Sequence, residues 1–295
     1  MAPYLFIIVL DYIMRHVMSK NNNGFTVEER KSRRIPEVKV TDLDFADDIA
    51  LISNLIDESQ RLLNDVETAA SKVGLHLNAK KTEVMIFNQP NMDILSQSGE
   101  KIKIVNDFKY LGSYVDDPEK DIKCRKAQAW SACNKLSKIW KSNLSRNLKI
   151  RIFTATVESV LLYGCEAWTL TKTTEKMIDG CYTRLLRSAL NVSWQDHVPN
   201  EILYGTLPKL SSKIRERRMR LAGHCVRHNE EEASKFVPWN PTRGRSKRGK
   251  RKTTFIDTLL RDTGCENENE IRTAMMDRDG WKRRIHEVRA GARPR

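Results

Sequence analysis

Two adjacent carboxylates, Asp47 and Asp48, stand between two runs of strand length and constrain this chain more than any other feature. The preceding segment, Asp42–Phe45, alternates acidic and apolar side chains, which is typical of a half-buried strand with its acids on the solvent side. The following segment, Ile49–Ile52, is an apolar run of similar length. Because Asp is a common turn residue, the pattern predicts a β-hairpin with both carboxylates at its tip.

This pair of carboxylates is a candidate metal site. Burying two carboxylates is costly unless positive charge lies close by, and Mg²⁺ is a cation that prefers oxygen ligands. A pair of Mg²⁺ ions can hold the attacking and leaving oxygens of a phosphoryl transfer. When the two residues are taken alone, the alternative is an ordinary solvated acidic turn.

Phe45–Asp48 resembles the aromatic-x-Asp-Asp box of reverse transcriptases, and further segments match this family in the same order along the chain. The wider pattern resembles the polymerases of LINE-type (non-LTR) retrotransposons. It comprises a template-and-nucleotide box at Ala2–Asp11, an Asn-x-x-Lys-Thr palm box within Gly74–Glu83, a primer-grip hairpin at Phe108–Gly112, and weaker similarity at Tyr163–Trp168 and Leu221–His224.

The resemblance implies RNA-templated DNA synthesis from deoxynucleoside triphosphates, with two Mg²⁺ as cofactors and an RNA template and a DNA primer as partners. It makes Asp47 the more direct metal ligand and Asp48 its support. Lys81 would place a cation near the triphosphate, where it neutralises or protonates the leaving group. The residues that would hold the primer end are Phe108, Tyr110 and Gly112, the last of which permits close backbone approach.

Simpler interpretations of these residues exist when the resemblance is set aside. Lys81 would be a solvated loop lysine, and Phe108 to Gly112 would belong to an ordinary strand. The family also places another catalytic Asp on an earlier palm strand, which we do not find in these 295 residues. We therefore expect the C-terminal part of a reverse transcriptase, inactive as a polymerase alone and holding at most one Mg²⁺ weakly.

Two other functional hypotheses stay open at this point. The chain could be a non-catalytic nucleic-acid-binding remnant of a retrotransposon, which would keep the charge but not the chemistry. It could also be a truncated product without a selected role. The first differs from the enzyme in one feature, which is whether a third carboxylate reaches Asp47 and Asp48.

The hydrophobic periodicity predicts an α+β fold, with a partial polymerase palm followed by a mainly helical region. Apolar steps of three and four residues predict helices at Leu5–Val17 and Asp57–Val73, the second ended by Gly74. Short strands are predicted at residues 75–77, 84–87, 101–105 and 108–115, and beyond Pro118 the apolar stripes are helical. The predicted domains are a palm part at 1–117, a helical thumb-like region at 118–205, and a basic helical region at 206–295 with a flexible segment at 240–252.

The net charge of +14 favours a polyanionic partner such as nucleic acid. Most of it lies in residues 212–295, which contain 23 Lys and Arg against 12 Asp and Glu. One stretch without acids could follow a phosphate backbone, although a nuclear-import signal or a solvated tail would use the same charges. Its seven basic residues are Arg243, Arg245, Lys247, Arg248, Lys250, Arg251 and Lys252.

The cysteines and the apolar runs bear on location. The six cysteines form no Cys-x-x-Cys pair, and no secretion signal is recognisable. We therefore expect a protein of the nucleus or cytoplasm whose cysteines are free thiols. The apolar run Tyr4–Leu10 is too short for a transmembrane segment. His224, Cys225 and His228 are zinc-ligand types on one predicted helix, but a fourth ligand such as Cys265 is distant in sequence, so zinc stays open.

Overall fold

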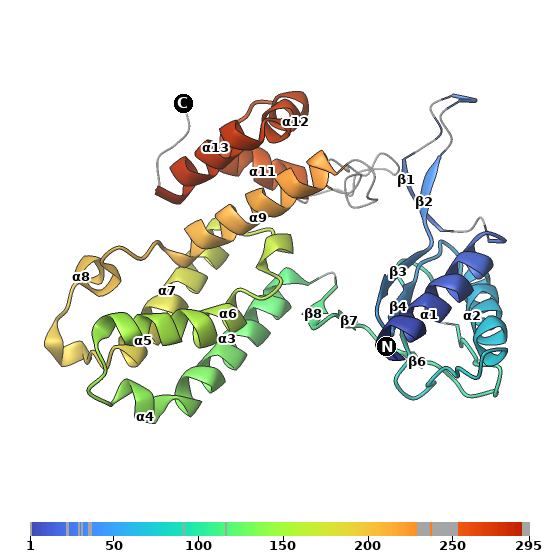
Figure 1. Ribbon diagram of the computed structural model, residues 1–295, viewed down its shortest axis with the longest axis horizontal. Coiled ribbons are helices and arrows are strands. Elements are labelled where there is room, and N and C mark those ends of the chain that lie inside the picture. Colours follow the sequence, from blue (N-terminus) through green and yellow to red (C-terminus); the bar gives the residue numbers. More distant parts are fainter. Residues whose placement is uncertain are drawn as a thin grey trace. The chain divides into compact units, whose positions relative to one another are not determined.

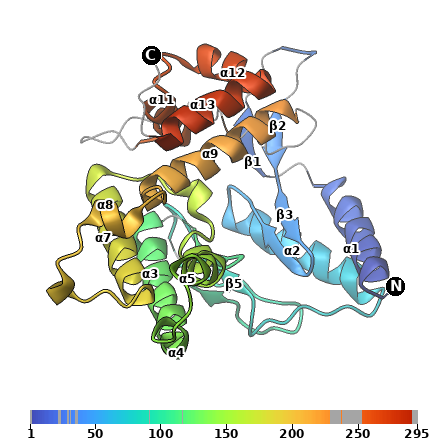
Figure 2. The ribbon, with the colours of Figure 1, turned by 60° about the vertical axis from the view of Figure 1, so that its left-hand side comes forward.

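The computed structural model describes residues 2–21, 24–28, 30, 32–34, 37–90, 92–115, 117–228, 237 and 253–290. The chain divides into two compact units, Met1–Asp116 and Asp117–Arg295. The first unit combines helices with short strand pairs, and the described part of the second is helical (Figures 1 and 2). The predicted α+β class is therefore confirmed.

The described residues of the first unit form two helices and four strand pairs. The helices are α1 (Ala2–Met18) and α2 (Ile56–Ser71), and they pack on each other. Every sheet among the described residues is two-stranded. The pairs are β1 (Phe25–Glu28) with β2 (Val38–Val40), β3 (Asp42–Phe45) with β4 (Asp48–Leu51), β5 (Glu83–Val84) with β6 (Lys103–Ile104), and β7 (Lys109–Tyr110) with β8 (Ser113–Tyr114). The β5–β6 pair is parallel and the others are antiparallel.

The helix predictions for this unit are confirmed, whereas the predictions of short strands need correction. Gly74 follows α2 with a φ of 78°, and the amide of Leu75 donates to the Ala70 carbonyl at 3.0 Å, so the helix ends where the glycine predicted it. The segment 75–77 is not a strand, and the predicted strands at 84–87 and 101–105 are reduced to Glu83–Val84 and Lys103–Ile104. The segment 108–115, predicted as one strand, is the β7–β8 hairpin. Periodicity does not show which segments pair, so it overstated the length of these strands.

The face of β3 was also predicted wrongly. Asp44 pairs with Ile49 of β4, and directly paired residues share a face. Ile49 packs against the cluster formed by α1 and α2, so Asp42 and Asp44 lie on the helix-covered face although the Asp44 side chain stays exposed. Phe45, which was expected to be buried, is 62% exposed. The apolar side chains of β4 thus decide which face of the hairpin packs.

The second unit is helical throughout its described residues, as the stripes beyond Pro118 predicted. Asp117 caps α3, since its Oδ1 accepts from the Lys120 amide at 2.9 Å and Pro118 begins the helix. The longer helices are α3 (Pro118–Lys135), α5 (Arg146–Phe153), α7 (Lys172–Ala189), α9 (Leu210–Arg227), α11 (Phe255–Thr263), α12 (Glu268–Met276) and α13 (Arg278–Ala290). Shorter ones are α4 (Ser137–Trp140), α6 (Ser159–Leu161), α8 (Asn200–Tyr204), the π-helix η1 (Thr154–Glu158), and the 3₁₀ helices η2 (Cys165–Ala167) and η3 (Trp194–Asp196).

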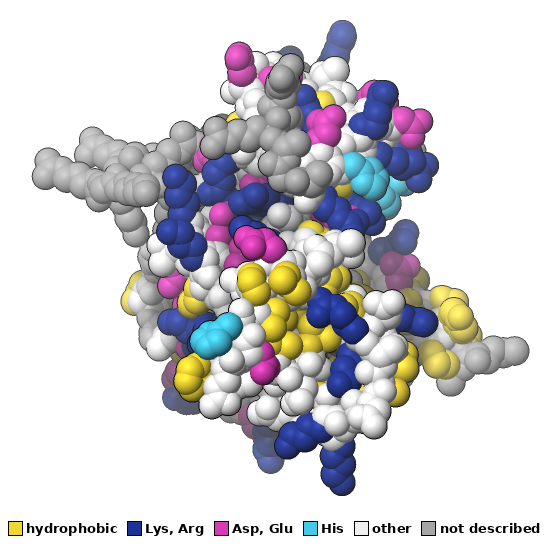
Figure 3. Space-filling model, turned by 90° about the vertical axis from the view of Figure 1, so that its left-hand side faces the viewer, with side chains coloured by type: hydrophobic (Ala, Val, Ile, Leu, Met, Phe, Trp, Pro, Cys, Tyr) yellow, Lys and Arg dark blue, Asp and Glu magenta, His cyan; other side chains and the backbone are white. Residues whose placement is uncertain are grey.

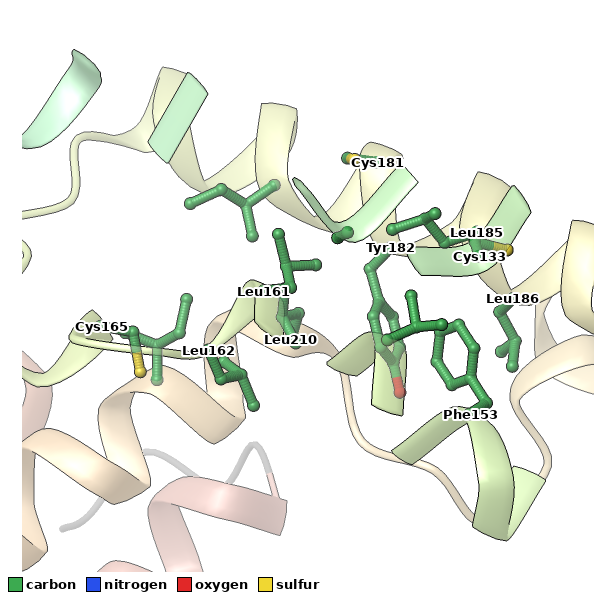
Figure 4. Packing of buried hydrophobic residues seen from close by; sticks show 14 of the residues in the cluster. Cys133, Phe153, Leu161, Leu162, Cys165, Cys181, Tyr182, Leu185, Leu186 and Leu210 are labelled. Atoms are coloured by element: carbon green, nitrogen blue, oxygen red, sulfur yellow. The ribbon is translucent and has the colours of Figure 1, made fainter. Parts of the chain in front are cut away.

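One core of this unit lies among α3, α5, α6 and α7. Figure 4 shows Phe153, Leu161, Tyr182 and Leu186 from these helices converging on one another. The Tyr182 hydroxyl donates to Glu158 Oε2 at 2.6 Å, and Lys213 Nζ donates to both carboxylate oxygens at 2.7 Å. Burial, with the Glu158 carboxylate next in effect, raises the pKa of Tyr182. The buried carboxylate of Glu158 is thus satisfied by a hydroxyl and a cation.

The other core joins α9 to α11, α12 and α13. Trp281 of α13 donates its indole NH to the Met219 carbonyl at 2.9 Å. A Cβ at Gly223 would lie 2.4 Å from Trp281 Nε1, so only glycine lets the two helices approach this closely. A fully buried Arg218 forms an ion pair with Asp262 of α11 in the same core.

Two negative findings concern only the described part of the chain. None of its helices is both long and apolar enough to cross a membrane. All six cysteines are described and are free thiols, and five of them are buried.

Candidate functional site

Asp47 and Asp48 lie at the tip of the β3–β4 hairpin, as predicted. The strands pair from Asp42–Leu51 to Phe45–Asp48, which leaves Ala46 and Asp47 as a two-residue turn. Ala46 adopts a φ of 54°, the left-handed backbone that such tight hairpin turns require. Both carboxylates are exposed at the tip.

The tip faces a cavity of about 550 Å³ within the first unit. Segments far apart in sequence line it, from α1 and α2 to the loop after Gly74 and the start of β7. Five of the predicted site residues line it together: Asp47, Asp48, Lys81, Phe108 and Tyr110. Gly112, the sixth in this unit, is not among the lining residues and instead forms the β7–β8 turn with a φ of 82°.

Tyr110 connects the predicted primer-grip hairpin to the carboxylate hairpin. Its hydroxyl donates to the Leu43 carbonyl at 2.9 Å and approaches the Asp48 carbonyl at 3.4 Å. Partial burial raises the pKa of Tyr110, and the negative charges of Asp44 and Asp48 raise it further. The phenol therefore stays protonated and keeps its donor role, which fixes β7 beside the hairpin that carries the two carboxylates.

Lys81 lies in a loop with a defined backbone. The Asn78 carbonyl accepts from the amides of Lys81 and Thr82, each at 3.0 Å, and from the Thr82 hydroxyl at the same distance. The Lys81 side chain is exposed and lines the same cavity as Asp47 and Asp48. Lys81, Asp47 and Asp48 thus line the same cavity. Among the described contacts, Lys81 forms no ion pair with either carboxylate.

Several lining residues were not singled out from the sequence. Glu67 of α2 lines the cavity, but its carboxylate already accepts from the Gln97 amide at 2.9 Å. His76 and Asn78 also line it, and both belong to the segment Gly74–Glu83 that contains the Asn-x-x-Lys-Thr pattern. Phe6 and Leu10 of α1 line it too, and the signal for them was the resemblance of Ala2–Asp11 to the template-and-nucleotide box.

The described residues do not complete a site for two Mg²⁺. No group of three His, Cys, Asp or Glu side chains suited to hold a metal occurs among them. Two adjacent carboxylates supply oxygens of the right chemistry for one hard cation, but two ions placed close together need a bridging ligand and more negative charge. The tip therefore fits a partial metal site rather than a complete one.

The other predicted residues either lie outside the described residues or do not line this cavity. The seven basic residues from Arg243 to Lys252 lie outside the described residues. His224 of α9 and His228, which follows this helix, are exposed with ring centroids 4.3 Å apart, while Cys225 is buried in the core. The Cys265 thiol accepts from Arg284 at 2.8 Å instead of joining them. In the part of the chain that the structure describes, these groups form no metal cluster.

Comparisons with known proteins bear on the same region. Residues 1–115 match the family model described as reverse transcriptase (RNA-dependent DNA polymerase). A transposon-derived protein of Caenorhabditis elegans is 23% identical in an alignment 273 residues long, which covers 84% of this chain and 96% of the relative. No solved structure matches the chain. The first unit is thus reverse-transcriptase-like, and similarity to a transposon-derived protein extends through most of the second.

Proposed function

We propose that residues 1–115 carry the C-terminal part of the palm of an RNA-directed DNA polymerase from a LINE-type retrotransposon. The observation that carries this proposal is the cavity on which Asp47, Asp48, Lys81, Phe108 and Tyr110 converge. These residues come from three separate motifs, and chance would rarely bring all three to one cavity. The similarity of residues 1–115 to reverse transcriptases supports the same reading.

Each residue has a role that its position suits. Asp47 and Asp48 would bind a divalent cation, which supplies charge stabilisation at the transferred phosphoryl group when bound. Lys81 would neutralise the triphosphate on the other side of the cavity. Phe108 would contact the primer end, and Tyr110 holds this segment at a fixed position relative to the Asp48 strand. Template RNA and primer DNA are the partners that such a site would take.

We further propose that the 295 residues alone do not extend a primer. The tip has two carboxylates, and the described residues supply no third one beside them. One weakly held Mg²⁺ is the most that this arrangement would bind. The second candidate function is a nucleic-acid-binding remnant, and the lack of a third carboxylate among the described residues favours it as well. In either case the protein would act where nucleic acid is found, in the nucleus or cytoplasm.

Primer extension on an RNA template, with Mg²⁺ or Mn²⁺, tests the proposal. The chain is compared with an Asp47→Ala/Asp48→Ala double variant and with Asp57→Ala, which removes an exposed acid of α2 outside the cavity. No extension by any of them, with template binding retained, agrees with the missing carboxylate. Extension that only the double variant loses would establish the polymerase site and disprove the proposed inactivity.

Binding of Mn²⁺ can be followed separately by its paramagnetic effect on solvent water. A Mn²⁺ site lost in the double variant and kept in Asp57→Ala would locate the ion at the hairpin tip. Equal Mn²⁺ binding by all three proteins would refute the assignment of Asp47 and Asp48 as ligands.

A further inference from the structure

A second cavity lies in the helical unit, far in sequence from the carboxylate hairpin. It measures about 290 Å³ and lies where α4 packs against α7. Its polar lining consists of two cations and four neutral hydrogen-bonding groups: Lys141, Arg187, Ser137, Ser188, Ser193 and Asn191. No acid is among its lining residues, all of which are described. This composition suits an anion that also accepts hydrogen bonds.

An exposed aromatic residue comes directly after one of the lining residues in the sequence. Trp194 is the residue after Ser193, and 78% of it is exposed. Figure 3, which looks onto the side of the unit that carries α4, α5 and α8, shows Lys and Arg side chains next to exposed hydrophobic ones. Binding grooves for single-stranded nucleic acids combine an exposed aromatic ring with cations. A base stacks on the ring, and the cations bind the phosphates.

The segment that holds Trp194 is well fixed. The Asp196 carboxylate accepts from the Ser193 amide at 2.7 Å, and the Ser193 hydroxyl accepts from the Gln195 amide at 3.3 Å. Arg187 donates to the Val198 carbonyl at 2.8 Å and to Asn200 Oδ1 at 2.9 Å. The indole is therefore carried by a segment that is already ordered without a ligand, which lowers the entropic cost of binding.

Two features oppose an anion here and need to be weighed. Asp196 is an acid near the cavity, and α7 ends beside it, so the negative end of a helix dipole is close. A helix end carries only a partial charge, and its effect falls off within the last turn. At the end of α4, which also borders the cavity, the Trp140 carbonyl already accepts from Lys149 Nζ at 2.6 Å. The three full charges of Lys141, Arg187 and the nearby Lys149 outweigh the single charge of Asp196 and the partial charge of the helix end.

We propose that this cavity and Trp194 form a subsite for single-stranded nucleic acid, with a backbone phosphate in the cavity and an adjacent base stacked on the indole. The subsite does not depend on the polymerase chemistry proposed for residues 1–115, because all of its residues belong to the second unit. It provides a contact to a strand through a phosphate and a ring, which recognises RNA and DNA alike.

Stacking on Trp194 is tested in the full chain with oligodeoxyuridine and oligouridine strands of about eight nucleotides, which differ only in the sugar and have a length within the usual site sizes. The variants are Trp194→Ala, which removes the ring, and Trp194→Phe, which keeps a stacking surface without indole fluorescence. We expect each strand to quench the wild-type fluorescence, and Trp194→Phe to lose that quenching with little change in affinity. Trp194→Ala should weaken binding at least about fivefold.

The phosphate contact is tested with a matched pair of lysines. Lys141→Gln removes a cavity charge, and Lys138→Gln removes the same charge from an exposed position outside the lining. Only Lys141→Gln should reduce the slope of log affinity against log salt, by about 0.7 for one single-strand phosphate contact. A blunt-ended duplex serves as the comparison that offers no unstacked base.

The outcomes are distinguishable from those of the polymerase assay. Equal quenching in wild type and Trp194→Phe, or equal effects of the two lysine variants, would overturn the subsite whatever the activity of Asp47 and Asp48. A response to only one of the two strands would retain the subsite and assign its sugar preference. The chain has six tryptophans, so only the part of the quenching that Trp194→Phe loses is assigned to Trp194, and binding by the basic stretch at 243–252 does not mimic that difference.

Discussion

The ion pair between Arg218 and Asp262 gives the sharpest prediction for the stability of the helical unit. The Arg218 side chain is fully buried and that of Asp262 is 2% exposed. Arg218 also donates to the Trp168 carbonyl, so the guanidinium bridges α9, α11 and the segment after η2. Burial lowers the pKa of Arg218, and the Asp262 carboxylate counteracts this shift by favouring the charged form.

Replacing Asp262 with Ala leaves a buried guanidinium with a carbonyl as its main partner. Removing one partner of a buried ion pair costs about 3 to 5 kcal/mol, since the remaining charge is not compensated. The double variant Arg218→Met/Asp262→Leu removes both charges and should recover most of this loss. Asp279→Ala is the control, because the Asp279 side chain is 86% exposed in its pair with Lys282 and should contribute less than about 1 kcal/mol.

Urea unfolding followed by tryptophan fluorescence measures these differences. All six tryptophans lie between Trp130 and Trp281, so the signal reports the second unit alone. A loss of less than about 1 kcal/mol in Asp262→Ala, equal to that of Asp279→Ala, would refute the reasoning. A double variant no more stable than Asp262→Ala would show that packing, not the unpaired charge, dominates.

Three further predictions concern other parts of the chain. Partial burial, and then the charge of Asp42, raises the pKa of Asp44 from 3.8 to about 6, so the folded form binds the proton more tightly than the unfolded form. The first unit should therefore lose stability as pH rises from about 4 to about 6. The loss should be less than about 1 kcal/mol because solvent still reaches more than a third of Asp44, and circular dichroism should find this slope flattened in Asp44→Asn. Gly223→Ala should destabilise the second unit by about 1 to 3 kcal/mol, because the new Cβ would lie 2.4 Å from Trp281 Nε1, whereas Gly180→Ala in α7 has open space and should be neutral or stabilising. Deleting residues 243–252 should flatten the slope of log nucleic-acid affinity against log salt by about 0.7 to 0.9 per lost phosphate contact, and an unchanged slope would show that the stretch is not a binding element.

The sequence predicted those elements whose side-chain period is strong and local. The helices α1 and α2 and the hairpin at Asp47 follow from spacing and turn chemistry, which act within a few residues. The ends of the short strands did not follow, because pairing such as that of Glu83 with Lys103 depends on a partner 20 residues away. Composition alone could also not predict the second cavity, since Lys141 and Arg187 belong to different helical segments.

The face of β3 illustrates the same limit more sharply. The alternation of Asp42–Phe45 predicts two faces but does not say which one packs, and acids normally face solvent. The partner strand decides, because Ile49 and Leu51 have a hydrophobic cluster to join and Leu43 and Phe45 do not. The sequence of β3 alone therefore predicted the alternation of its side chains correctly, but it predicted the wrong face to be the packed one.

This reversal also decides whether Asp44 can complete the carboxylate site. Asp48 pairs with Phe45 and Asp44 pairs with Ile49, so the side chains of Asp44 and Asp48 point to opposite faces of the hairpin. Asp44 instead faces Asp42 and Asp11, whose negative charges add to burial in raising its pKa to about 6. A carboxylate held there cannot bridge an ion at the tip without breaking the β3–β4 register. A third ligand must therefore come from a different element. Adding an acid to the Asp48 face of the hairpin, for example with Phe45→Asp, tests whether more negative charge alone raises the affinity of the tip for Mn²⁺.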